Sequence, residues 1–182
     1  QVEACTYEDG VCKYCGAKEP SVTYMSHVQT YGDLEWVADG ELSGTSGESK
    51  RMESIRIELE NVDALSGIEY SAHVQREGWQ DPVADGELSG TSGESKRVEA
   101  IKINLTGSIA NNYDVYYRVH AQNFGWLGWA KNGEEAGTAG FSYRLEAFQI
   151  RLVKKGEEAP ADPSMAKPFI QKMVQYRTHV QT

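Results

Sequence analysis

The sequence predicts an all-β protein made of three copies of one structural unit. A Tyr-x-x-His segment begins at Tyr24, Tyr70 and Tyr117, so the unit recurs every 46 or 47 residues. The fifteen residues VADGELSGTSGESKR stand without a change at positions 37–51 and 83–97. Each copy also alternates apolar and polar residues and contains glycine-rich turns. A repeat of this length with strand periodicity is typical of a closed β architecture.

Each unit opens on a predicted strand. In the second unit, one face carries Tyr70, Ala72 and Val74, and the other carries Ser71, His73 and Gln75. Successive side chains of a strand point to opposite faces of a sheet, so this alternation predicts one buried face and one more polar face.

Each unit closes on a second predicted strand, which reads RMESIRIEL, RVEAIKINL or RLEAFQIRL. In the second unit Val98 and Ala100 share one face, whereas Ile101, Ile103 and Leu105 share the other. This change of phase predicts a bulge or bend near Ala100. Between the two strands lies a glycine-rich segment, GTSG or GTAG, which predicts turns and a short third strand.

We predict that the three units close on one another with pseudo-threefold symmetry, as in a β-prism. A unit with only three or four strands cannot enclose a core alone, so neighbouring units must cover its apolar edges. Closure also minimises exposed strand edges. A β-trefoil is the alternative arrangement. An open solenoid ranks third, because no outer unit has the pattern of a polar cap.

The repeats divide the chain into several parts. They are a Cys-containing leader (1–20), three repeats (21–66, 67–113 and 114–158), a polar linker (159–175) and the start of a truncated fourth repeat (176–182). The fourth repeat begins with YRTHVQT and then stops, and the chain begins with Gln1 rather than Met. We therefore expect the chain to be a piece of a longer protein.

Composition and motif content argue against several classes of function. The formal charge of −9 disfavours binding to nucleic acid or to an anionic membrane, because both require clustered Lys and Arg. No run approaches the roughly 18 apolar residues of a membrane-spanning helix. No P-loop, Gly-x-Ser-x-Gly or His-Glu-x-x-His pattern occurs, and the ionisable groups recur symmetrically. We expect no enzymatic activity, no nucleic-acid partner and no membrane insertion.

The repeat resembles the clostridial hydrophobic repeat with Trp, the ChW repeat. The resemblance rests on AHVQ, a following Gly-Trp, then DG, GT, G and the closing strand, as seen over residues 72–105. The two aromatic positions are filled by Trp126 and Trp129 in the third repeat, by Trp79 and Pro82 in the second, and by Asp33 and Trp36 in the first. The resemblance implies a secreted or cell-surface protein of Firmicutes. It also implies a role in substrate binding or protein attachment.

Seven residues are candidate ligand-binding residues. A carbohydrate site combines an aromatic platform for the apolar face of a sugar with hydrogen-bonding groups for its hydroxyls. The candidates are the tryptophans and the acid or amide of the turn that follows each of them: Trp36 and Asp39, Trp79 and Asp85, and Trp126, Trp129 and Asn132. Such a site would recur up to three times and raise avidity. The competing interpretation is that the repeated turn serves only the fold.

Other recurring side chains also have a structural interpretation. A Trp after Gly at a strand end commonly closes a core, although Phe124 beside Trp126 and Trp129 predicts that at least one aromatic residue is exposed. Three histidines, His27, His73 and His120, are expected to be hydrogen-bonded, with a metal on a threefold axis as the alternative. Three pairs are predicted to be structural ion pairs: Arg51–Glu53, Arg97–Glu99 and Arg144–Glu146.

The leader contains the three cysteines of the chain, Cys5, Cys12 and Cys15. Cys12-x-x-Cys15 followed by Gly16 is half of a zinc-ribbon pattern, with Cys5 as a third ligand and no evident fourth ligand. The alternative is an oxidised pair and one free thiol, as suits an extracellular protein. We expect no other cofactor.

Together these observations predict a non-catalytic, secreted or surface-attached module that binds carbohydrate of a bacterial wall or a host glycoprotein. The alternative is a protein-binding adhesin that engages a host protein such as an immunoglobulin, or another surface protein. A structural spacer is the third interpretation.

Overall fold

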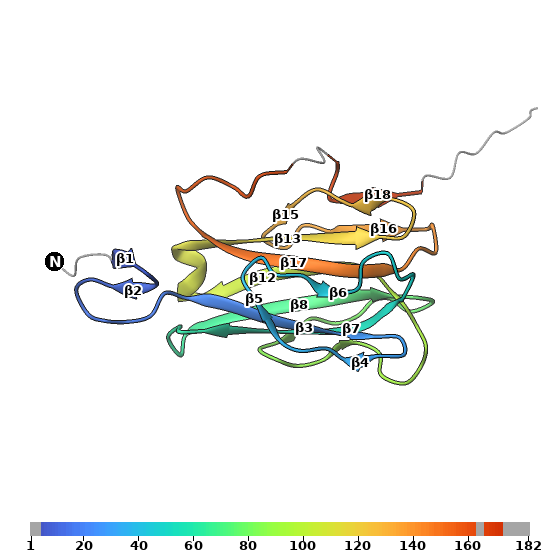
Figure 1. Cartoon of the computed structure of the whole chain (residues 1–182), viewed down its shortest axis with the longest axis horizontal. Helices are drawn as coiled ribbons and strands as arrows, with labels where there is room; N and C mark the ends of the chain where they lie inside the picture. The colour runs from blue at the N-terminus through green and yellow to red at the C-terminus, as the bar shows by residue number, and fades with distance from the viewer. Residues whose placement is uncertain (1–4, 163–165, 173–182) are drawn as a thin grey trace, which may run out of the picture.

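A computed structural model describes residues 5–162 and 166–172 of the chain (Figure 1). The described residues form strands and turns, with a 3-10 turn, η1 (Ser108–Asn111), as their one helical element, so the predicted all-β class is confirmed.

The first repeat contains β3 (Ser21–Val28), β4 (Gly32–Asp33), β5 (Val37–Ala38), β6 (Ser43–Gly44) and β7 (Met52–Glu60). The second contains β8 (Ser66–Val74), β9 (Gly78–Trp79), β10 (Val83–Ala84), β11 (Ser89–Gly90) and β12 (Val98–Gly107). The third contains β13 (Tyr113–Ala121), β14 (Gly125–Trp126), β15 (Ala130–Lys131), β16 (Ala136–Ala139) and β17 (Leu145–Lys154).

The two long strands of each repeat form an antiparallel pair: β3 with β7, β8 with β12, and β13 with β17. Two short strands of the same repeat pair with the first long strand. The register of β8 against β12 shifts between Val98 and Ala100, which confirms the bulge predicted near Ala100. The other two repeats have a register shift at the equivalent place.

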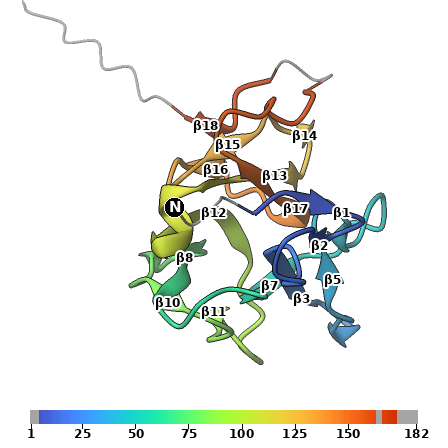
Figure 2. The same cartoon turned by 90° about the vertical axis from the view of Figure 1, so that its left-hand side faces the viewer.

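The remaining short strand of each repeat pairs with the sheet of another repeat. β11 of the second repeat pairs with β7 of the first, β16 of the third with β12 of the second, and β6 of the first with β17 of the third. Figure 2 shows the three sheets end-on, grouped around a common centre. The exchange forms a closed cycle, which an open solenoid would not form. The prism stays our prediction of how the three sheets face one another.

The exchanged strands explain the first glycine of the GTSG or GTAG segment, which is Gly44, Gly90 or Gly137. Gly90 has a φ of +117°, and a Cβ built on it would lie 2.4 Å from the carbonyl oxygen of Glu53. Gly44 and Gly137 occupy the same place in the other two sheets, with the same close approach to backbone. A side chain would therefore separate the exchanged strand from its neighbour.

The three sheets share one hydrophobic core. It includes Tyr24, Tyr70 and Tyr117, the first residue of each Tyr-x-x-His segment, and all three are almost completely buried. The predicted alternation holds in β8 for Tyr70, Ala72 and Val74, which are buried. Ser71, expected on the more polar face, is also buried, because the turn of the third repeat at Asn132 and Gly133 lies on that side of the strand.

Two segments outside the repeats also form strands. In the leader, β1 (Tyr7–Glu8) and β2 (Val11–Cys12) form a hairpin at the end of the molecule where the chain begins (Figure 1). β18 (Phe169–Gln171) falls within the predicted linker and pairs in parallel with β16. The predicted start of a fourth repeat, 176–182, lies outside the described residues.

Candidate functional site: grooves between repeats

The Asp-Gly or Asn-Gly turn of each repeat lies on the sheet that receives its exchanged strand. The turn glycine donates a backbone hydrogen bond across this boundary: Gly40 to Ile150 O at 2.7 Å, Gly86 to Ile57 O at 2.8 Å, and Gly133 to Ile103 O at 2.7 Å. At two of these boundaries, beside Gly40 and beside Gly133, residues of two repeats line a groove.

The acid or amide of each turn is bound to backbone. Asp39 accepts hydrogen bonds from the amides of Val22, at 3.3 Å, and Leu152, at 3.2 Å. Asp85 accepts one from Ile68 at 3.1 Å, and Asn132 accepts one from Val115 at 2.9 Å. These three candidate ligand-binding residues thus tie each turn to the first long strand of its own repeat.

The third-repeat groove contains a stack of aromatic and cationic side chains. The guanidinium of Arg118 lies 4.8 Å from the ring centroid of Trp126 and 4.8 Å from that of Trp129, so it is stacked between the two. Burial lowers the pKa of Arg118. The groove, of about 170 Å³, is lined by Gly40, Arg118, Trp129, Gln149, Arg151, Pro160 and Ala161. From the sequence, Asp39 was expected to form a site with Trp36 of the same repeat. In the structure, Gly40, which follows Asp39, lines the groove of Trp129 in the third repeat.

The chain that follows the third repeat covers part of this groove. The indole Nε1 of Trp129 donates a hydrogen bond to Ala161 O at 3.3 Å, and Gly128 N donates to Lys167 O at 3.4 Å. A Cβ on Gly128 would lie 2.0 Å from Ala166 O. Gly128 therefore leaves space for this segment, and the position holds Glu35 and Asp81 in the other repeats.

The second-repeat groove is lined by a mixture of polar, charged and apolar side chains. It has a volume of about 210 Å³ and is lined by Glu69, Tyr70, Ser71, Pro82, Lys102, Ile103, Asn104, Asn132 and Gly133. Lys102 Nζ lies 4.2 Å from the ring centroid of Trp79. The edge of the same indole meets His73 at a centroid distance of 5.4 Å. Trp79 is half-buried beside this groove, and it contacts Lys102, which lines the groove.

Trp36 of the first repeat is the most exposed of the four tryptophans, at 43%. Among the described residues, no cation lies over its ring. Asp33 stands where the other repeats have Trp79 and Trp126, and it binds His27 Nδ1 at 2.7 Å. The first repeat thus keeps one aromatic platform and replaces the other with an ion-pair partner.

The repeated histidines and the Arg-Glu pairs form local clusters. The predicted ion pairs Arg51–Glu53, Arg97–Glu99 and Arg144–Glu146 are present at 2.7, 2.8 and 2.7 Å. His73 Nδ1 lies 3.4 Å from Glu99, and His120 Nδ1 lies 3.1 Å from Glu146. Each histidine faces a carboxylate of its own repeat, so the alternative of a shared axial metal finds no support.

The three cysteines of the leader lie together. Their sulfur atoms are within 4.8 Å of one another, and the Cys5 and Cys15 sulfurs are 3.7 Å apart without a disulfide. Thiolates about 2.3 Å from a tetrahedral zinc ion would be about 3.8 Å apart, so this donor set fits zinc. A hydrogen bond from Cys5 lowers the pKa of Cys12 to about 6, and the same contact raises the pKa of Cys5 to about 11.

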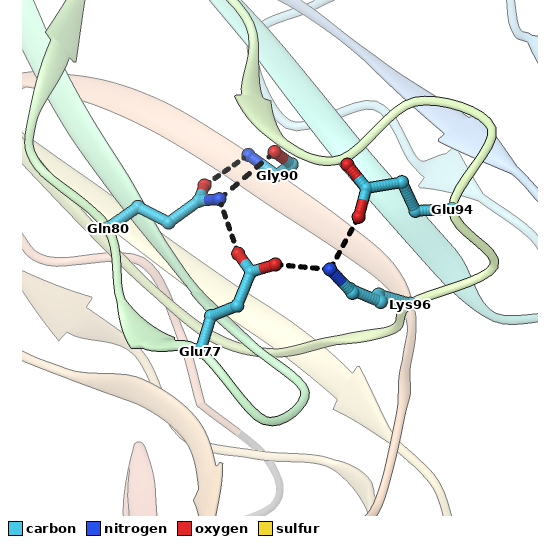
Figure 3. A network of polar contacts seen from close by, with 5 residues as sticks. All are labelled: Glu77, Gln80, Gly90, Glu94 and Lys96. Carbon is cyan, nitrogen blue, oxygen red and sulfur yellow. Dashed lines mark hydrogen bonds and ion pairs between the residues drawn. The ribbon is translucent and has the colours of Figure 1, made fainter.

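A set of three equivalent loop positions differs in chemistry from repeat to repeat. The first repeat has Tyr31, Glu48 and Lys50, the second has Glu77, Glu94 and Lys96, and the third has Phe124, Phe141 and Tyr143. In the second repeat Lys96 pairs with both glutamates (Figure 3). In the third, the three rings pack at centroid distances of 5.4 to 5.7 Å, and Phe124 is exposed.

Arg118 and Lys102 line the grooves but were not predicted as site residues. Both occupy positions where the repeats disagree: Arg118 corresponds to Met25 and Ser71, and Lys102 corresponds to Arg56 and Gln149. The aromatic character of Phe141 and Tyr143 was visible, but their contact with Phe124 depends on how two loops meet.

The fold defines an all-β repeat protein in which two grooves are lined by residues of two repeats. The family described as Clostridial hydrophobic W, ChW, matches residues 27–61, 73–107 and 120–154, together more than half of the chain. The protein belongs to the ChW family, and its match to three repeats confirms the resemblance seen in the sequence. No curated protein and no solved structure matched the chain. Among the described residues, no helix has the length and apolar character to cross a membrane.

Proposed function

We propose that this protein is a non-catalytic, secreted or cell-surface module that binds carbohydrate in its second-repeat groove. The observation that carries the proposal is the lining of this groove. Ser71 and Asn104 offer a hydroxyl and an amide, and Lys102 offers an ammonium that also pairs with Glu135 at 3.1 Å and lies over the ring of Trp79. Such a combination suits the hydroxyl edge and the apolar face of a sugar.

The two other repeats have different roles in this proposal. The third-repeat groove is narrowed by Pro160 and Ala161, and Trp129 already donates its indole N–H to the chain. The exposed ring of Trp36 offers a second, shallower platform in the first repeat. The seven candidate residues therefore divide: Trp36 and Trp79 are the proposed platforms, whereas Trp126 and Trp129 stack on Arg118. The remaining three candidates accept hydrogen bonds from backbone amides and so hold their turns in place: Asp39, Asp85 and Asn132.

The proposal is tested by screening the protein on an array of bacterial wall polysaccharides, mucin glycans and host proteins. Trp79→Ala and Trp129→Ala are screened in parallel. We expect glycan binding that is lost in Trp79→Ala and kept in Trp129→Ala. Loss in Trp129→Ala alone, with both variants folded, would move the site to the third repeat.

A second candidate function is binding to a protein, as in an adhesin. The observation that favours it is the cluster of Phe124, Phe141 and Tyr143, where the second repeat has ion-paired residues. An exposed aromatic cluster is typical of protein interfaces. On the same array, this function predicts binding to a protein spot regardless of its glycosylation. Phe124→Glu would abolish that binding.

We also propose that the leader binds one zinc ion through Cys5, Cys12 and Cys15. The support is the short distances between the sulfur atoms and the low pKa of Cys12, which favours the thiolate that zinc requires. Bound zinc would be structural here, fixing the leader hairpin at one end of the molecule. The alternative of an oxidised pair would leave a single free thiol.

A further inference from the structure

The exchanged strands β6, β11 and β16 occupy equivalent positions, so each sheet presents an equivalent outer edge. Thr45 N donates to Glu146 O at 2.8 Å, and Thr91 N donates to Glu53 O at 2.9 Å. In an antiparallel pair, residues alternate between bonding to the neighbouring strand and pointing away from it. The N–H and C=O of Gly44 and Gly90 therefore point away from the long strand, toward the edge.

In the third repeat this edge is occupied by the chain's own β18. Gly137 N donates to Pro168 O at 2.9 Å, and Lys172 N donates to Ala139 O at 2.9 Å. Ile170 of β18 packs against the core cluster that contains Leu127, and Leu127 is only 1% exposed. This edge thus accepts an extended segment in parallel orientation.

In the second repeat a side chain satisfies the same edge. The amide of Gln80 accepts a hydrogen bond from Gly90 N at 2.7 Å and donates one to Gly90 O at 3.2 Å (Figure 3). Gln80 occupies the position of Leu127 in the third repeat. One glutamine side chain therefore replaces the backbone groups of an added strand.

In the first repeat, the equivalent edge has neither an added strand nor a glutamine side chain bonded to it. Leu34 occupies the position of Gln80, and its side chain has no hydrogen-bonding group. Among residues 5–162 and 166–172, no partner is recorded for the edge-facing N–H and C=O of Gly44. Leu34 is also partly exposed, whereas the equivalent Leu127 is covered.

We infer that the edge of β6 at Gly44 binds an extended peptide segment of a separate protein, which adds to the sheet in parallel with β6. Strand addition to a sheet edge supplies backbone hydrogen bonds, and alternate side chains supply specificity. The chain's own equivalent segment already occupies β16. The inference does not depend on the proposed carbohydrate groove.

The surroundings of the edge define the chemistry of this peptide. It carries an apolar residue at the position of Ile170, where it covers Leu34. Asp33 and Glu35 flank Leu34 and are exposed, so a basic residue at the position of Lys167 is favoured. Glu35 stands in place of Gly128, where a Cβ would meet Ala166 O at 2.0 Å. The incoming segment must therefore join the edge at the position of Lys167.

The probe is a synthetic peptide, Lys-Pro-Phe-Ile-Gln-Lys, which copies residues 167–172 with blocked ends. It is titrated into the full chain by fluorescence anisotropy, and the amide of Gly44 is followed by NMR. We expect the peptide to bind one site on the wild-type protein and to bind Leu34→Gln at least about tenfold more weakly. The introduced glutamine would bond to Gly44 as Gln80 bonds to Gly90 in the second repeat. Gln80→Leu should gain a second site.

The matched control is the same peptide with proline in place of isoleucine, which removes an N–H and should not bind. The thermal unfolding of each variant shows whether it is folded. Equal binding of the peptide to the wild-type protein and Leu34→Gln would overturn the inference, and so would absence of binding to both the wild-type protein and Gln80→Leu. Self-association that Leu34→Gln abolishes would assign the edge to a second copy of this chain and overturn the separate partner.

Discussion

The phenol oxygen of Tyr70 lies 3.1 Å from the backbone nitrogen of Ile57 and accepts its hydrogen bond, so a side chain of the second repeat completes the backbone of the first. The same hydroxyl donates to the carbonyl of Glu87 in its own turn. The equivalent hydroxyls of Tyr24 and Tyr117 donate to the equivalent turn carbonyls. These tyrosines therefore connect core, turn and neighbouring repeat.

Tyr70→Phe should destabilise the protein, because it leaves the Ile57 N–H and the Glu87 carbonyl without their partner. An unsatisfied buried polar group costs about 1–3 kcal/mol, so the free energy of unfolding should fall by that amount. Urea unfolding measures the change. Tyr14→Phe, at an exposed leader residue, is the control and should leave the free energy of unfolding unchanged. A neutral Tyr70→Phe would show that the hydroxyl does not hold the repeats together.

Stability should fall at alkaline pH because of the same tyrosines. Burial raises the pKa of Tyr24 and of Tyr70 to about 12, from an ordinary value of about 10. Between these values the unfolded chain has lost protons that the native protein retains, so the free energy of unfolding decreases as pH rises from about 10 to about 12. Phenolate absorbance of native and urea-unfolded protein tests this. Coincident titration curves would contradict it.

Gly90→Ala should be more damaging than Gly93→Ala. Both glycines have positive φ, but a Cβ on Gly93 meets nothing within 4 Å, whereas one on Gly90 lies 2.4 Å from Glu53 O. Gly93→Ala should cost about 1–2 kcal/mol through its φ alone. Gly90→Ala should cost clearly more, because β11 must move away from β7. Equal losses in thermal unfolding would show that the close approach between β11 and β7 is unimportant.

The leader should bind one zinc ion per chain under reducing conditions. Native mass spectrometry of the protein titrated with zinc measures the stoichiometry. Cys12→Ser should lose the metal, because Cys12 has the thiol with the lowered pKa. Serine introduced elsewhere, as in Ala17→Ser, serves as the control. Absence of zinc binding together with one titratable thiol after air oxidation would favour the disulfide alternative.

Much of the fold could be predicted because its determinants are local and repeated. The alternation of apolar and polar residues from Tyr70 to Val74 predicted the first strand of the unit. The change of phase at Ala100 predicted the bulge. Glycines in the repeated fifteen residues predicted turns. The exchange of β6, β11 and β16 could not be predicted, because short Ser-Gly or Ala-Gly segments carry no information about which long strand they will join.

The candidate site was harder to predict from the sequence. Trp36, Trp79, Trp126 and Trp129 stand out by residue type, but their exposure depends on cations from other strands. Arg118 lies over Trp126 and Trp129, and Lys102 lies over Trp79. Each cation stands at a position that holds a different residue in the other repeats, so the repeat pattern did not point to it. The acids of the turns were expected beside the preceding tryptophan, whereas the exchange carries each turn to another repeat. Spacing in the sequence does not encode contacts of that kind.

The most direct test of the account is a calorimetric titration of the strongest glycan from the array into the wild-type protein and two folded variants, Trp79→Ala and Trp129→Ala. We predict that Trp79→Ala loses at least about tenfold in affinity, about 1.4 kcal/mol, while Trp129→Ala binds as the wild type does. Undiminished binding by Trp79→Ala, or no glycan binding by the wild-type protein, would contradict it.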